Sequence, residues 1–409
     1  MTKEIKQRIE QIKNGEVPQG YKKTKIGIVP NEWEVSKLNK FLKVCKEKND
    51  ELLYGKEDVF SISGEYGIVN QIKFLGRSYA GASVEAYRVV RSGDIVYTKS
   101  PLKNNPYGII KANLKDKTGI VSTLYAVYKC NENVLPSYVQ WYFGLDNILN
   151  NYLLPLVNIG AKNDMKISDE NVLKGDVIFP KLFEQQKIAD ILSTQDKVIE
   201  LKEKLLKEKE KRKKYLMQIL LTGRKRLKGF NGEWKKYNFE NIFRVIASNK
   251  YQIKKNEYLV EGVYPVIDQG KKEIVGYSNN EEKVLKCPQE GIIVFGDHTC
   301  CLKFIDFDFI VGADGTQLLS SKSDEFLNIF LYYYLSNKKI INDGYSRHFK
   351  YIKEFVYTLP KFEEQKAIAE ILTTADKELK LLQEELEEEK RKKKALMQLL
   401  LTGIVRVKV

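Results

Sequence analysis

A long segment occurs twice in this chain. Residues 180–223 and residues 360–403 align without a gap, at an offset of 180 positions. Both copies begin with Pro-Lys, and both end in LMQ, one variable residue and LLTG. An internal repeat of this length dictates the architecture, because each copy must occupy an equivalent place in the fold.

Each copy predicts one long helix. Ala, Leu, Lys, Glu and Gln dominate it, no Pro or Gly interrupts it, and Gly223 or Gly403 stands at the expected stop. About 40 residues at 1.5 Å each give a rod of about 60 Å. Its apolar residues recur every three or four positions and form a stripe that one helix cannot bury alone, so each copy needs a partner, and the other copy is the nearest candidate. The stripe comprises Ile188, Ile191, Leu192, Val198, Ile199, Leu205, Leu206, Leu216, Ile219 and Leu220 in the first copy and Ile368, Ile371, Leu372, Leu379, Leu382, Leu386, Leu396, Leu399 and Leu400 in the second.

A globular segment precedes each long helix, over roughly residues 34–179 and 235–359. A tryptophan, Trp33 or Trp234, stands just before each segment. Short apolar runs bounded by turn residues predict strands, at Asp94 to Thr98, Gly119 to Cys130, Tyr264 to Asp268 and Gly291 to Asp297. Helical stretches follow, at Ser137 to Leu153 and Glu325 to Asn337.

The predicted fold class is therefore α+β. Two globular domains are expected to be joined and separated by two long antiparallel coiled-coil helices, with a pseudo-twofold internal repeat. The glutamates from Glu384 to Glu389 could pair with lysines of the first helix, or they could lie in solvent, since exposed pairs contribute little. Because the two globular segments diverge in sequence and length, equal scaffolds would present different surfaces.

Composition narrows the class of partner. The chain has 409 residues, and 69 Lys and Arg against 54 Asp and Glu give a net charge of +15, which suits a polyanion such as nucleic acid. Five cysteines without paired spacing indicate reduced thiols and a cytoplasmic protein. No apolar run is long enough for a membrane span.

Motifs for catalysis are mostly missing from the sequence. It contains no GxxxxGK[ST] phosphate loop, no HExxH and no GxSxG. His298 and His348 are interpreted as surface or hydrogen-bonding residues rather than metal ligands. The sequence Asn-Asn-Pro-Tyr at 104–107 partly matches the motif with which amino-methyltransferases hold adenine, but a turn loop explains it better. No methyl donor is expected to bind this chain alone.

The order of these motifs resembles a known family. Pro30 and Trp33, the Pro-Lys-x-x-Glu-Gln pieces at 180–185 and 360–365, and the LMQ-x-LLTG endings at 216–223 and 396–403 are together similar to the specificity subunit of type I restriction-modification enzymes. The likeness covers essentially the whole chain. It implies two target recognition domains, each reading half of a split sequence in double-stranded DNA, and antiparallel helices that separate the domains.

The resemblance also implies partners and a division of labour. Two modification (methyltransferase) subunits would dock on the helices, and restriction (motor and nuclease) subunits would join for cleavage. S-adenosylmethionine, ATP and magnesium would belong to those subunits, so this chain would need no cofactor, hold no metal and catalyse no reaction. The half-sites would lie about one DNA turn apart or somewhat more.

The resemblance divides the chain into six segments. They are an N-terminal helical segment (1–23), a first target recognition domain (24–181), a first conserved long helix (182–223), a second target recognition domain (224–361), a second conserved long helix (362–403) and a C-terminal tail (404–409).

Polar residues next to predicted strands and turns are the candidates for DNA contact, because base edges and phosphates are contacted by such side chains. Each could equally lie in a loop without a contact. The candidates are Thr98, Lys99, Ser100, Lys103, Asn104, Asn105, Lys162 and Asn163 in the first domain, and Asp297, His298, Thr299, Thr316, Gln317, Ser346, Arg347, His348 and Lys350 in the second.

Other functions stay open at this point. A coiled-coil adaptor with incidental basic charge, or a DNA-binding protein without modification partners, would share the helices and the charge. An enzyme in its own right, such as a nuclease or methyltransferase, would need an acidic metal cluster or a cofactor loop that the sequence does not display.

Overall fold

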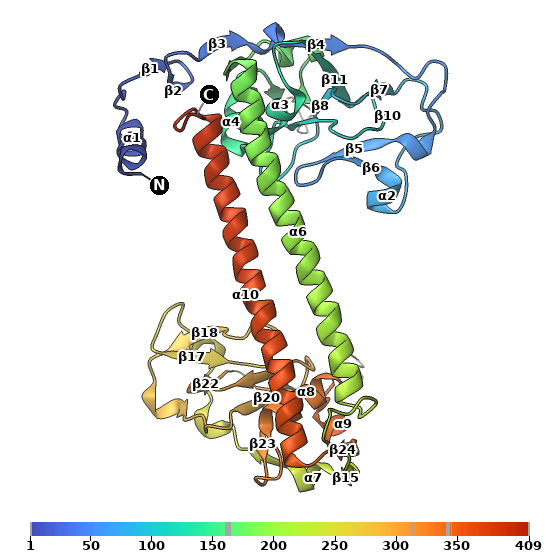
Figure 1. Cartoon of the computed structure of the whole chain (residues 1–409), viewed down its shortest axis with the longest axis vertical. Helices are drawn as coiled ribbons and strands as arrows, with labels where there is room; N and C mark the ends of the chain where they lie inside the picture. The colour runs from blue at the N-terminus through green and yellow to red at the C-terminus, as the bar shows by residue number, and fades with distance from the viewer. Residues whose placement is uncertain (1, 160–164, 313, 341–343, 345, 408–409) are drawn as a thin grey trace. The chain divides into compact units, whose positions relative to one another are not determined.

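The chain forms two compact units (Figure 1). The computed structural model describes residues 2–159, 165–312, 314–340, 344 and 346–407. The first unit comprises Met1–Leu201 with Leu386–Val409, and the second comprises Lys202–Glu385. Each unit therefore combines one globular part with half of each long helix.

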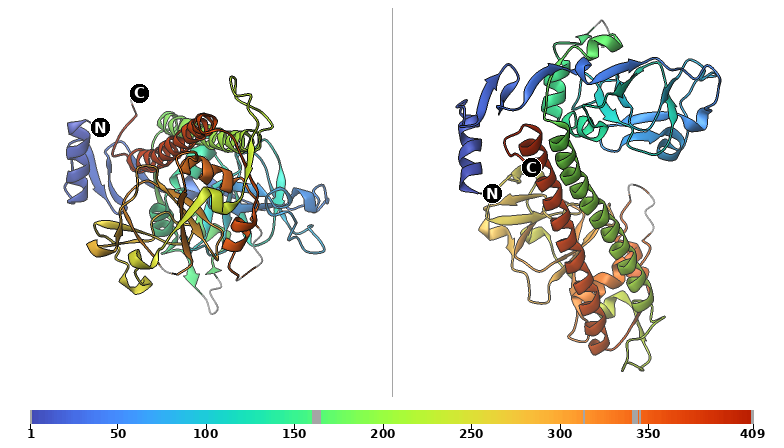
Figure 2. Two further views of the ribbon diagram at one scale, coloured as in Figure 1. Left: turned by 90° about the horizontal axis from the view of Figure 1, so that it is seen from below. Right: turned by 45° about the horizontal axis from the view of Figure 1, so that its top comes forward.

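The two copies of the repeat form single long helices, as predicted. They are α6 (Leu182–Leu220) and α10 (Phe362–Leu401). In each unit the two helices lie side by side (Figures 1 and 2). In the second unit Lys202 pairs with Glu385 and Lys213 with Asp376, so the partner number falls as the first number rises. The pairing is thus antiparallel, as the sequence predicts.

The glutamates from Glu384 to Glu389 of α10 partly pair with α6 and partly face solvent, so both predicted alternatives occur. Glu385 accepts from Lys202 at 2.8 Å, and Glu389 accepts from the amide of Gln195 at 2.6 Å. Glu387, in contrast, pairs only along its own helix, with Lys390 at 3.5 Å. The run therefore contributes some contacts across the helix pair and leaves other carboxylates toward solvent.

Most of the predicted apolar stripe is at least partly buried, but some members are exposed. Ile188, Leu192 and Leu220 are at most 3% exposed, whereas Ile191 is 39% and Leu205 is 46% exposed. Consecutive residues on a helix point about 100° apart, so the neighbour of an inward-facing residue can lie outside the buried face. The inclusion of Ile191, Leu205 and Ile371 in the buried stripe was wrong for this reason.

Both long helices end in the same way. Gly223 and Gly403 follow them with φ of +69° and +72°, the left-handed conformation that glycine adopts without a steric penalty. In each case the amide two residues later donates back to the helix, from Lys225 to Ile219 O at 3.1 Å and from Val405 to Leu399 O at 3.0 Å. The LLTG ending is therefore a stop signal that turns the chain back toward the helix.

The globular part of the first unit is built on a four-stranded antiparallel sheet in the order β4-β11-β8-β9. Its apolar core lies between this sheet, the short helices and the ends of α6 and α10. The elements are α1 (Lys3–Lys13), β1 (Tyr21–Thr24), β2 (Gly27–Pro30), β3 (Glu34–Lys37), β4 (Leu42–Cys45), β5 (Phe60–Ser63), β6 (Gly67–Asn70), α2 (Gln71–Leu75), β7 (Arg88–Val90), β8 (Ile95–Thr98), β9 (Ile109–Ala112), β10 (Gly119–Val121), β11 (Tyr125–Cys130), α3 (Pro136–Tyr142), α4 (Asp146–Leu153), β12 (Asn158–Ile159), β13 (Met165–Lys166), α5 (Asp169–Val172) and β14 (Asp176–Phe179).

The second unit repeats that sheet in the order β16-β23-β20-β21. A second four-stranded sheet, β18-β17-β22-β19, includes one parallel pair, β17 with β22. The elements are β15 (Lys235–Tyr237), α7 (Phe239–Ile242), β16 (Phe243–Ile246), β17 (Tyr264–Ile267), β18 (Gly276–Ser278), β19 (Val284–Leu285), β20 (Ile292–Gly296), β21 (Leu302–Ile305), β22 (Phe309–Val311), β23 (Thr316–Ser321), α8 (Asn328–Ser336), α9 (Phe349–Glu354) and β24 (Tyr357–Leu359).

Two predicted elements are divided in the structure. The run from Gly119 to Cys130 forms β10 and β11, which belong to different sheets. The stretch from Ser137 to Leu153 forms α3 and α4. At Gly144, between these helices, a Cβ would lie 3.0 Å from Trp141 O and 3.2 Å from the Met397 side chain. The carbonyls of α3 and the Met397 side chain of α10 thus leave little room for a Cβ where the helical stretch breaks.

A tryptophan, a glutamate and an arginine join each globular part to a long helix. In the first unit, the Glu184 carboxylate accepts a hydrogen bond from Trp33 Nε1 at 3.1 Å. It also accepts from Arg406 Nε at 2.5 Å and from Arg406 Nη2 at 2.9 Å. The Glu184 side chain is 6% exposed. Removing one partner of such a buried pair is costly, because the other charge stays buried. We name this set the first clamp.

The second clamp has the same chemistry. The Glu364 carboxylate accepts a hydrogen bond from Trp234 Nε1 at 3.3 Å and from Arg226 Nε and Nη2, both at 2.6 Å. Its side chain is 3% exposed. The tryptophan that precedes each globular segment and the glutamate of the following Glu-Gln pair therefore form one buried ion-pair arrangement built twice, although they are 151 positions apart in the first unit and 130 in the second.

Candidate nucleic-acid interface

Three predicted segments of the second unit come together at the end of its main sheet. They are residues 297–299 after β20, residues 316–317 at the start of β23, and residues 346–350 around the start of α9. Asp297 N donates to Gly315 O at 2.7 Å, and His348 N donates to Asp297 O at 2.9 Å. His298 Nδ1 lies 3.1 Å from Ser346 O. Segments about 50 residues apart thus form one polar loop cluster.

Three of the predicted contact residues form the inner layer of this cluster. Asp297, Thr316 and His348 are buried, with 3%, 4% and 0% of their surface exposed. Asp297 Oδ1 accepts from Phe349 N at 2.8 Å, and His348 Nδ1 lies 2.8 Å from Asp297 O. Asp297 and His348 thus hold the loops together. DNA contact by these three residues stays a prediction.

The remaining predicted residues of the second unit form the outer layer. Thr299, Arg347 and Lys350 are exposed, and His298, Gln317 and Ser346 are half-buried. The Lys350 ammonium lies 4.9 Å from the centre of the Tyr351 ring, which holds this cation beside an aromatic face. These six residues stay candidates for DNA contact.

Gln269 was missed by sequence reasoning, although it connects these loops. Its amide donates to Asp314 O at 2.8 Å and accepts from His298 N at 3.1 Å, and its carbonyl accepts from the Thr299 hydroxyl. Beside it, Lys303 donates to Asp268 O at 2.8 Å. Burial lowers the pKa of Lys303, and the nearby Asp268 partly opposes that effect. The available signal was the polar pair Asp268-Gln269, which directly follows the strand β17.

The corresponding loop of the first unit follows β8. Lys99 forms an ion pair with Asp169 at 3.3 Å, and Arg88 binds the other oxygen of that carboxylate at 2.5 Å. The Asp169 side chain is 10% exposed. Asp169 and Arg88 were not predicted, because each is polar but stands far in the sequence from the loop that it holds.

The loop itself is a hydrogen-bonded turn. Asn105 is 7% exposed and donates to Asp146 at 3.0 Å, while Asn104 O accepts from Asn150 at 2.9 Å. Tyr97 donates its hydroxyl proton to Tyr107 O at 2.7 Å. The interpretation of residues 104–107 as turn chemistry agrees with these contacts.

The predicted residues of the first unit also fall into two layers. Thr98 is 4% exposed and accepts from Ser100 N at 3.2 Å, so Thr98 and Asn105 are inner-layer residues, and their contact with DNA stays a prediction. Ser100, Lys103 and Asn104 are exposed and Lys99 is half-buried, and these remain candidates. Lys162 and Asn163 lie outside the described residues.

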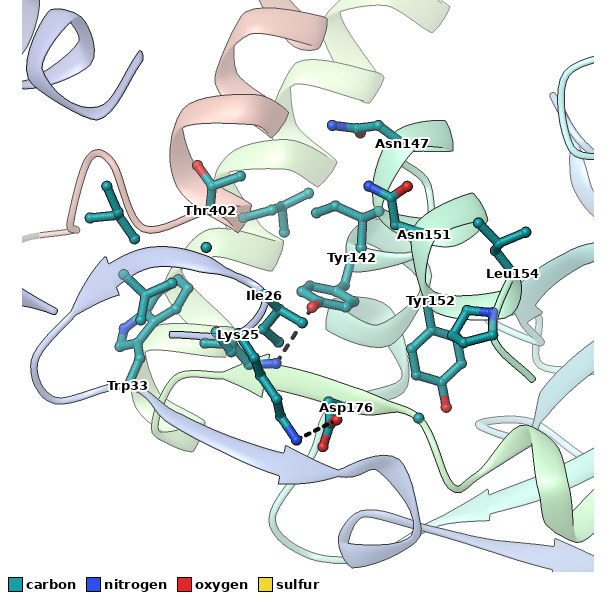
Figure 3. Close-up of a pocket in the computed structure, with 18 of the residues that line it drawn as sticks. Lys25, Ile26, Trp33, Tyr142, Asn147, Asn151, Tyr152, Leu154, Asp176 and Thr402 are labelled. Carbon is teal, nitrogen blue, oxygen red and sulfur yellow. Dashed lines mark hydrogen bonds and ion pairs between the residues drawn. The ribbon is translucent and has the colours of Figure 1, made fainter. Parts of the chain in front are cut away.

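A separate pocket of about 780 Å³ lies in the first unit (Figure 3). It is lined by the β1–β2 hairpin, α4 and the end of α10. At its edge Asp176 pairs with Lys25 at 2.6 Å and with Lys37 at 3.1 Å. The hydrogen bond from Lys25 holds the pKa of Asp176 below its ordinary value. None of the predicted DNA-contact residues lines this pocket, so it is separate from the candidate interface.

Within the described ranges, no three His, Cys, Asp or Glu side chains are grouped so that they could hold a metal ion. No helix in the same part of the chain has the length and apolar character needed to cross a membrane.

Comparison with known families decides what these two units are. The family model of the type I restriction modification DNA specificity domain matches the chain twice, at residues 30–211 and 231–390. The chain belongs to this family. Each match contains one globular part and most of the long helix that follows it, so the family unit coincides with the internal repeat.

One relative of this specificity subunit extends over nearly its whole length, and another matches about a quarter of it. The putative type I restriction enzyme MjaX specificity subunit of Methanocaldococcus jannaschii is 27% identical over 95% of this chain and 97% of its own. The EcoR124I/EcoR124II specificity subunit of Escherichia coli is 29% identical over 27% of this chain and 28% of its own.

Solved structures show the same fold. The S subunit of a type I restriction-modification system from M. genitalium aligns over 92% of this chain and 97% of its own, with a TM-score of 0.58 and 14% identity. A chain from a study of assembly and conformational transition of the type I system aligns with a TM-score of 0.53, 18% identity and coverage of 92% and 99%. At these identities the likeness concerns the fold alone. The predicted fold class and the family resemblance are confirmed.

Proposed function

We propose that each recognition domain of this DNA specificity subunit reads one half of a bipartite target. The observation that supports this most is that equivalent loops carry different functional groups on equivalent sheets. Lys99-Ser100 follows β8, which ends at Thr98, and Asp297-His298-Thr299 follows β20. Because each base pair presents its own pattern of donors and acceptors, loops with different side chains select different bases.

The exposed cations of these loops supply affinity. Lys103 in the first domain and Arg347 and Lys350 in the second are exposed. A net charge of +15 suits the displacement of counterions from DNA. In this arrangement the cations bind phosphates, and the neighbouring polar groups read base edges.

The long helices set the distance between the half-sites. They have 39 and 40 residues, which corresponds to about 60 Å of helix each. In this proposal a change in helix length changes the tolerated spacer and leaves the half-sites unaltered. Removing about two turns, ~7 residues, from matched positions of α6 and α10 is the corresponding experiment, and an unchanged spacer would exclude helix length as its determinant.

The modification subunits dock on the long helices. Three apolar pairs at the 180-residue offset are exposed to similar extents: Leu182 with Phe362 (42% and 36%), Ile191 with Ile371 (39% and 36%) and Leu201 with Leu381 (53% and 61%). Exposed apolar side chains that recur at equivalent positions favour two equivalent partner surfaces. This supports two modification subunits per chain, joined by restriction subunits when DNA is cleaved.

Catalysis belongs to those partners. In this proposal the modification subunits hold S-adenosylmethionine, the restriction subunits use ATP and magnesium, and this chain holds no cofactor or metal and is not an enzyme. It works in the cytoplasm, where its double-stranded DNA target lies.

The test is the map of methylated bases in host DNA, made with and without this chain. The proposal expects a motif of two short specific halves separated by a fixed number of unspecified bases, present only when the chain is present. A contiguous motif, or a map that does not change when the chain is deleted, contradicts the proposal. Binding to random duplexes by the isolated chain distinguishes a DNA-binding protein from an adaptor.

A further inference from the structure

An aspartate, a lysine and an aromatic ring meet in the first unit where the recognition domain rests on the long helices. Asp196 of α6 forms an ion pair with Lys393 of α10. The Lys393 ammonium lies 4.9 Å from the centre of the ring of Trp141, which belongs to α3. Trp141 is 7% exposed. We name this set the first junction, because it joins one helix of the domain to both long helices.

The second unit contains the same set, here named the second junction. Asp376 of α10 forms an ion pair with Lys213 of α6. The Lys213 ammonium lies 5.6 Å from the centre of the Tyr333 ring of α8. Tyr333 also donates its hydroxyl proton to Asp376 Oδ2 at 2.7 Å. The carboxylate therefore binds both the lysine of one long helix and the aromatic residue of the domain.

The two junctions are related by the internal repeat. Asp196 and Asp376 are 180 positions apart, and so are Lys213 and Lys393. The aspartate lies on α6 and the lysine on α10 in the first junction, and these helices exchange roles in the second. This exchange is what a twofold internal repeat of an antiparallel helix pair produces, because each helix then supplies the aspartate to one junction and the lysine to the other.

The aromatic residues also occupy equivalent places. Tyr142, next to Trp141, accepts from Ile178 N at 3.4 Å, and Tyr334, next to Tyr333, accepts from Thr358 N at 3.1 Å. Those two donors are again 180 positions apart. α3 and α8 are therefore seated in the same way, although their sequences differ.

Each junction lies between the long helices and the part of the domain that carries the candidate DNA-contact loops. α3 packs on β8 and β9, and α8 packs on β20 and β21. The candidate DNA-contact loops follow β8 and β20 directly. The lysines and aspartates of the junctions are 21% to 44% exposed, and ion pairs of this exposure contribute little to stability. Their specific geometry is better explained by a role in orienting the recognition domain on the long helices than by a role in stabilising the fold.

We propose that the two junctions fix the angle at which each recognition domain sits on its part of the helix pair, and that this angle determines how strictly spacer length is discriminated. The proposal rests on the bipartite function proposed above. Lys213, Lys393, Asp196, Asp376, Trp141 and Tyr333 are positioning residues in this role. They act through α3 and α8 and contact no base.

The experiment uses the complex of the full chain with its modification subunits. Methylation is measured on duplexes that carry both mapped half-sites, with the spacer varied by one and two base pairs in each direction. The variant carries Lys213→Met and Lys393→Met, which remove the charges and keep the side-chain stems. A second variant carries Lys213→Asp with Asp376→Lys, which exchanges the two charges. The matched control is Lys209→Met, because Lys209 pairs with Glu378 between the long helices without a domain side chain.

The double Met variant is expected to lose at least about fivefold of the wild-type preference for the correct spacer over its neighbours. Its penalty for a wrong base in either half-site should stay unchanged, the charge exchange, which alters the second junction alone, should lose less of the preference than the double Met variant, and Lys209→Met should behave as wild type. A double Met variant with the wild-type spacer profile, or one that loses half-site and spacer discrimination together, overturns the inference alone. A wild-type complex that ignores spacer length overturns the bipartite function as well.

Discussion

The two clamps have the same chemistry but draw their arginines from different parts of the chain. Arg226 of the second clamp lies in the segment between α6 and β15. Its guanidinium carbon lies 5.6 Å from the centre of the Trp234 ring. Arg406 of the first clamp lies near the C-terminus, 222 positions from Glu184. The arginine of the first clamp thus comes from the segment after α10, and the arginine of the second clamp comes from the segment after α6.

The chain end that supplies Arg406 is held by the N-terminal segment. Arg8 donates to Ile404 O at 3.0 Å, and Tyr21 donates to Gly403 O at 2.8 Å. Arg406 also pairs with Glu32 at 2.9 Å. The N-terminal segment and the tail therefore act together as a closure for the first unit.

The largest effect is expected from removing the tail. Deleting residues 404–409 removes Arg406 and the apolar contacts of Val405 and Val407 with the core, and it leaves Glu184 buried without its cation. The loss should be about 3–5 kcal/mol for the first unit. Hydrogen exchange should rise in residues 182–201 and stay unchanged in the globular part of the second unit.

The matched comparison is Arg406→Ala against Arg226→Ala. The first should destabilise the first unit and the second should destabilise the second unit, since each arginine serves one buried glutamate. Faster exchange in both units with either variant would show that the clamps are not independent.

A smaller effect is expected from the tryptophans. Trp33→Phe removes the Nε1 donor of Glu184 and part of a side chain that is 1% exposed. It should cost about 2 kcal/mol, as for a buried hydrogen bond with a change of core volume. Trp234 is only half-buried, so Trp234→Phe should cost less. Equal losses in urea unfolding of the two variants would contradict the difference in burial.

The smallest effect concerns pH. The hydrogen bond from Lys25 lowers the pKa of Asp176 in the folded state. The carboxylate therefore adds stability above the ordinary aspartate pKa of about 4, and this stability disappears as pH falls through the lowered value. At pH 7 the Asp176→Asn variant should have a lower melting temperature than wild type, which corresponds to a loss in the free energy of unfolding of under about 1 kcal/mol. This difference should vanish in acid. A difference that persists at low pH would exclude the ion pair as its source.

Sequence reasoning predicted the elements that depend on local pattern. The long helices follow from composition and from the glycine stops, and the strands at residues 94–98 and 291–297 follow from apolar runs between turns. The break between α3 and α4 was not predicted, although Gly144 stands inside the predicted helical stretch and glycine is a poor helix former. Exposed and buried positions of the stripe were also confused where two apolar residues are adjacent.

The candidate interface was less predictable for a related reason. Burial of Asp297, Thr316 and His348 depends on contacts between loops that are distant in the sequence, so polar character alone suggested DNA contact. The first clamp gave one usable signal. The tail sequence TGIVR at 402–406 aligns with TGRKR at 222–226, and this alignment places Arg406 and Arg226 at equivalent positions.

The central claim is that each recognition domain determines one half of the target. Its most direct test is the methylation map of cells that carry Ser100→Ala with Lys103→Ala, compared with cells that carry Thr299→Ala with Arg347→Ala. The claim predicts that the first pair relaxes or changes one half of the motif only, and that the second pair affects only the other half. Maps in which both pairs alter the same half, or in which either pair alters both halves, would contradict it.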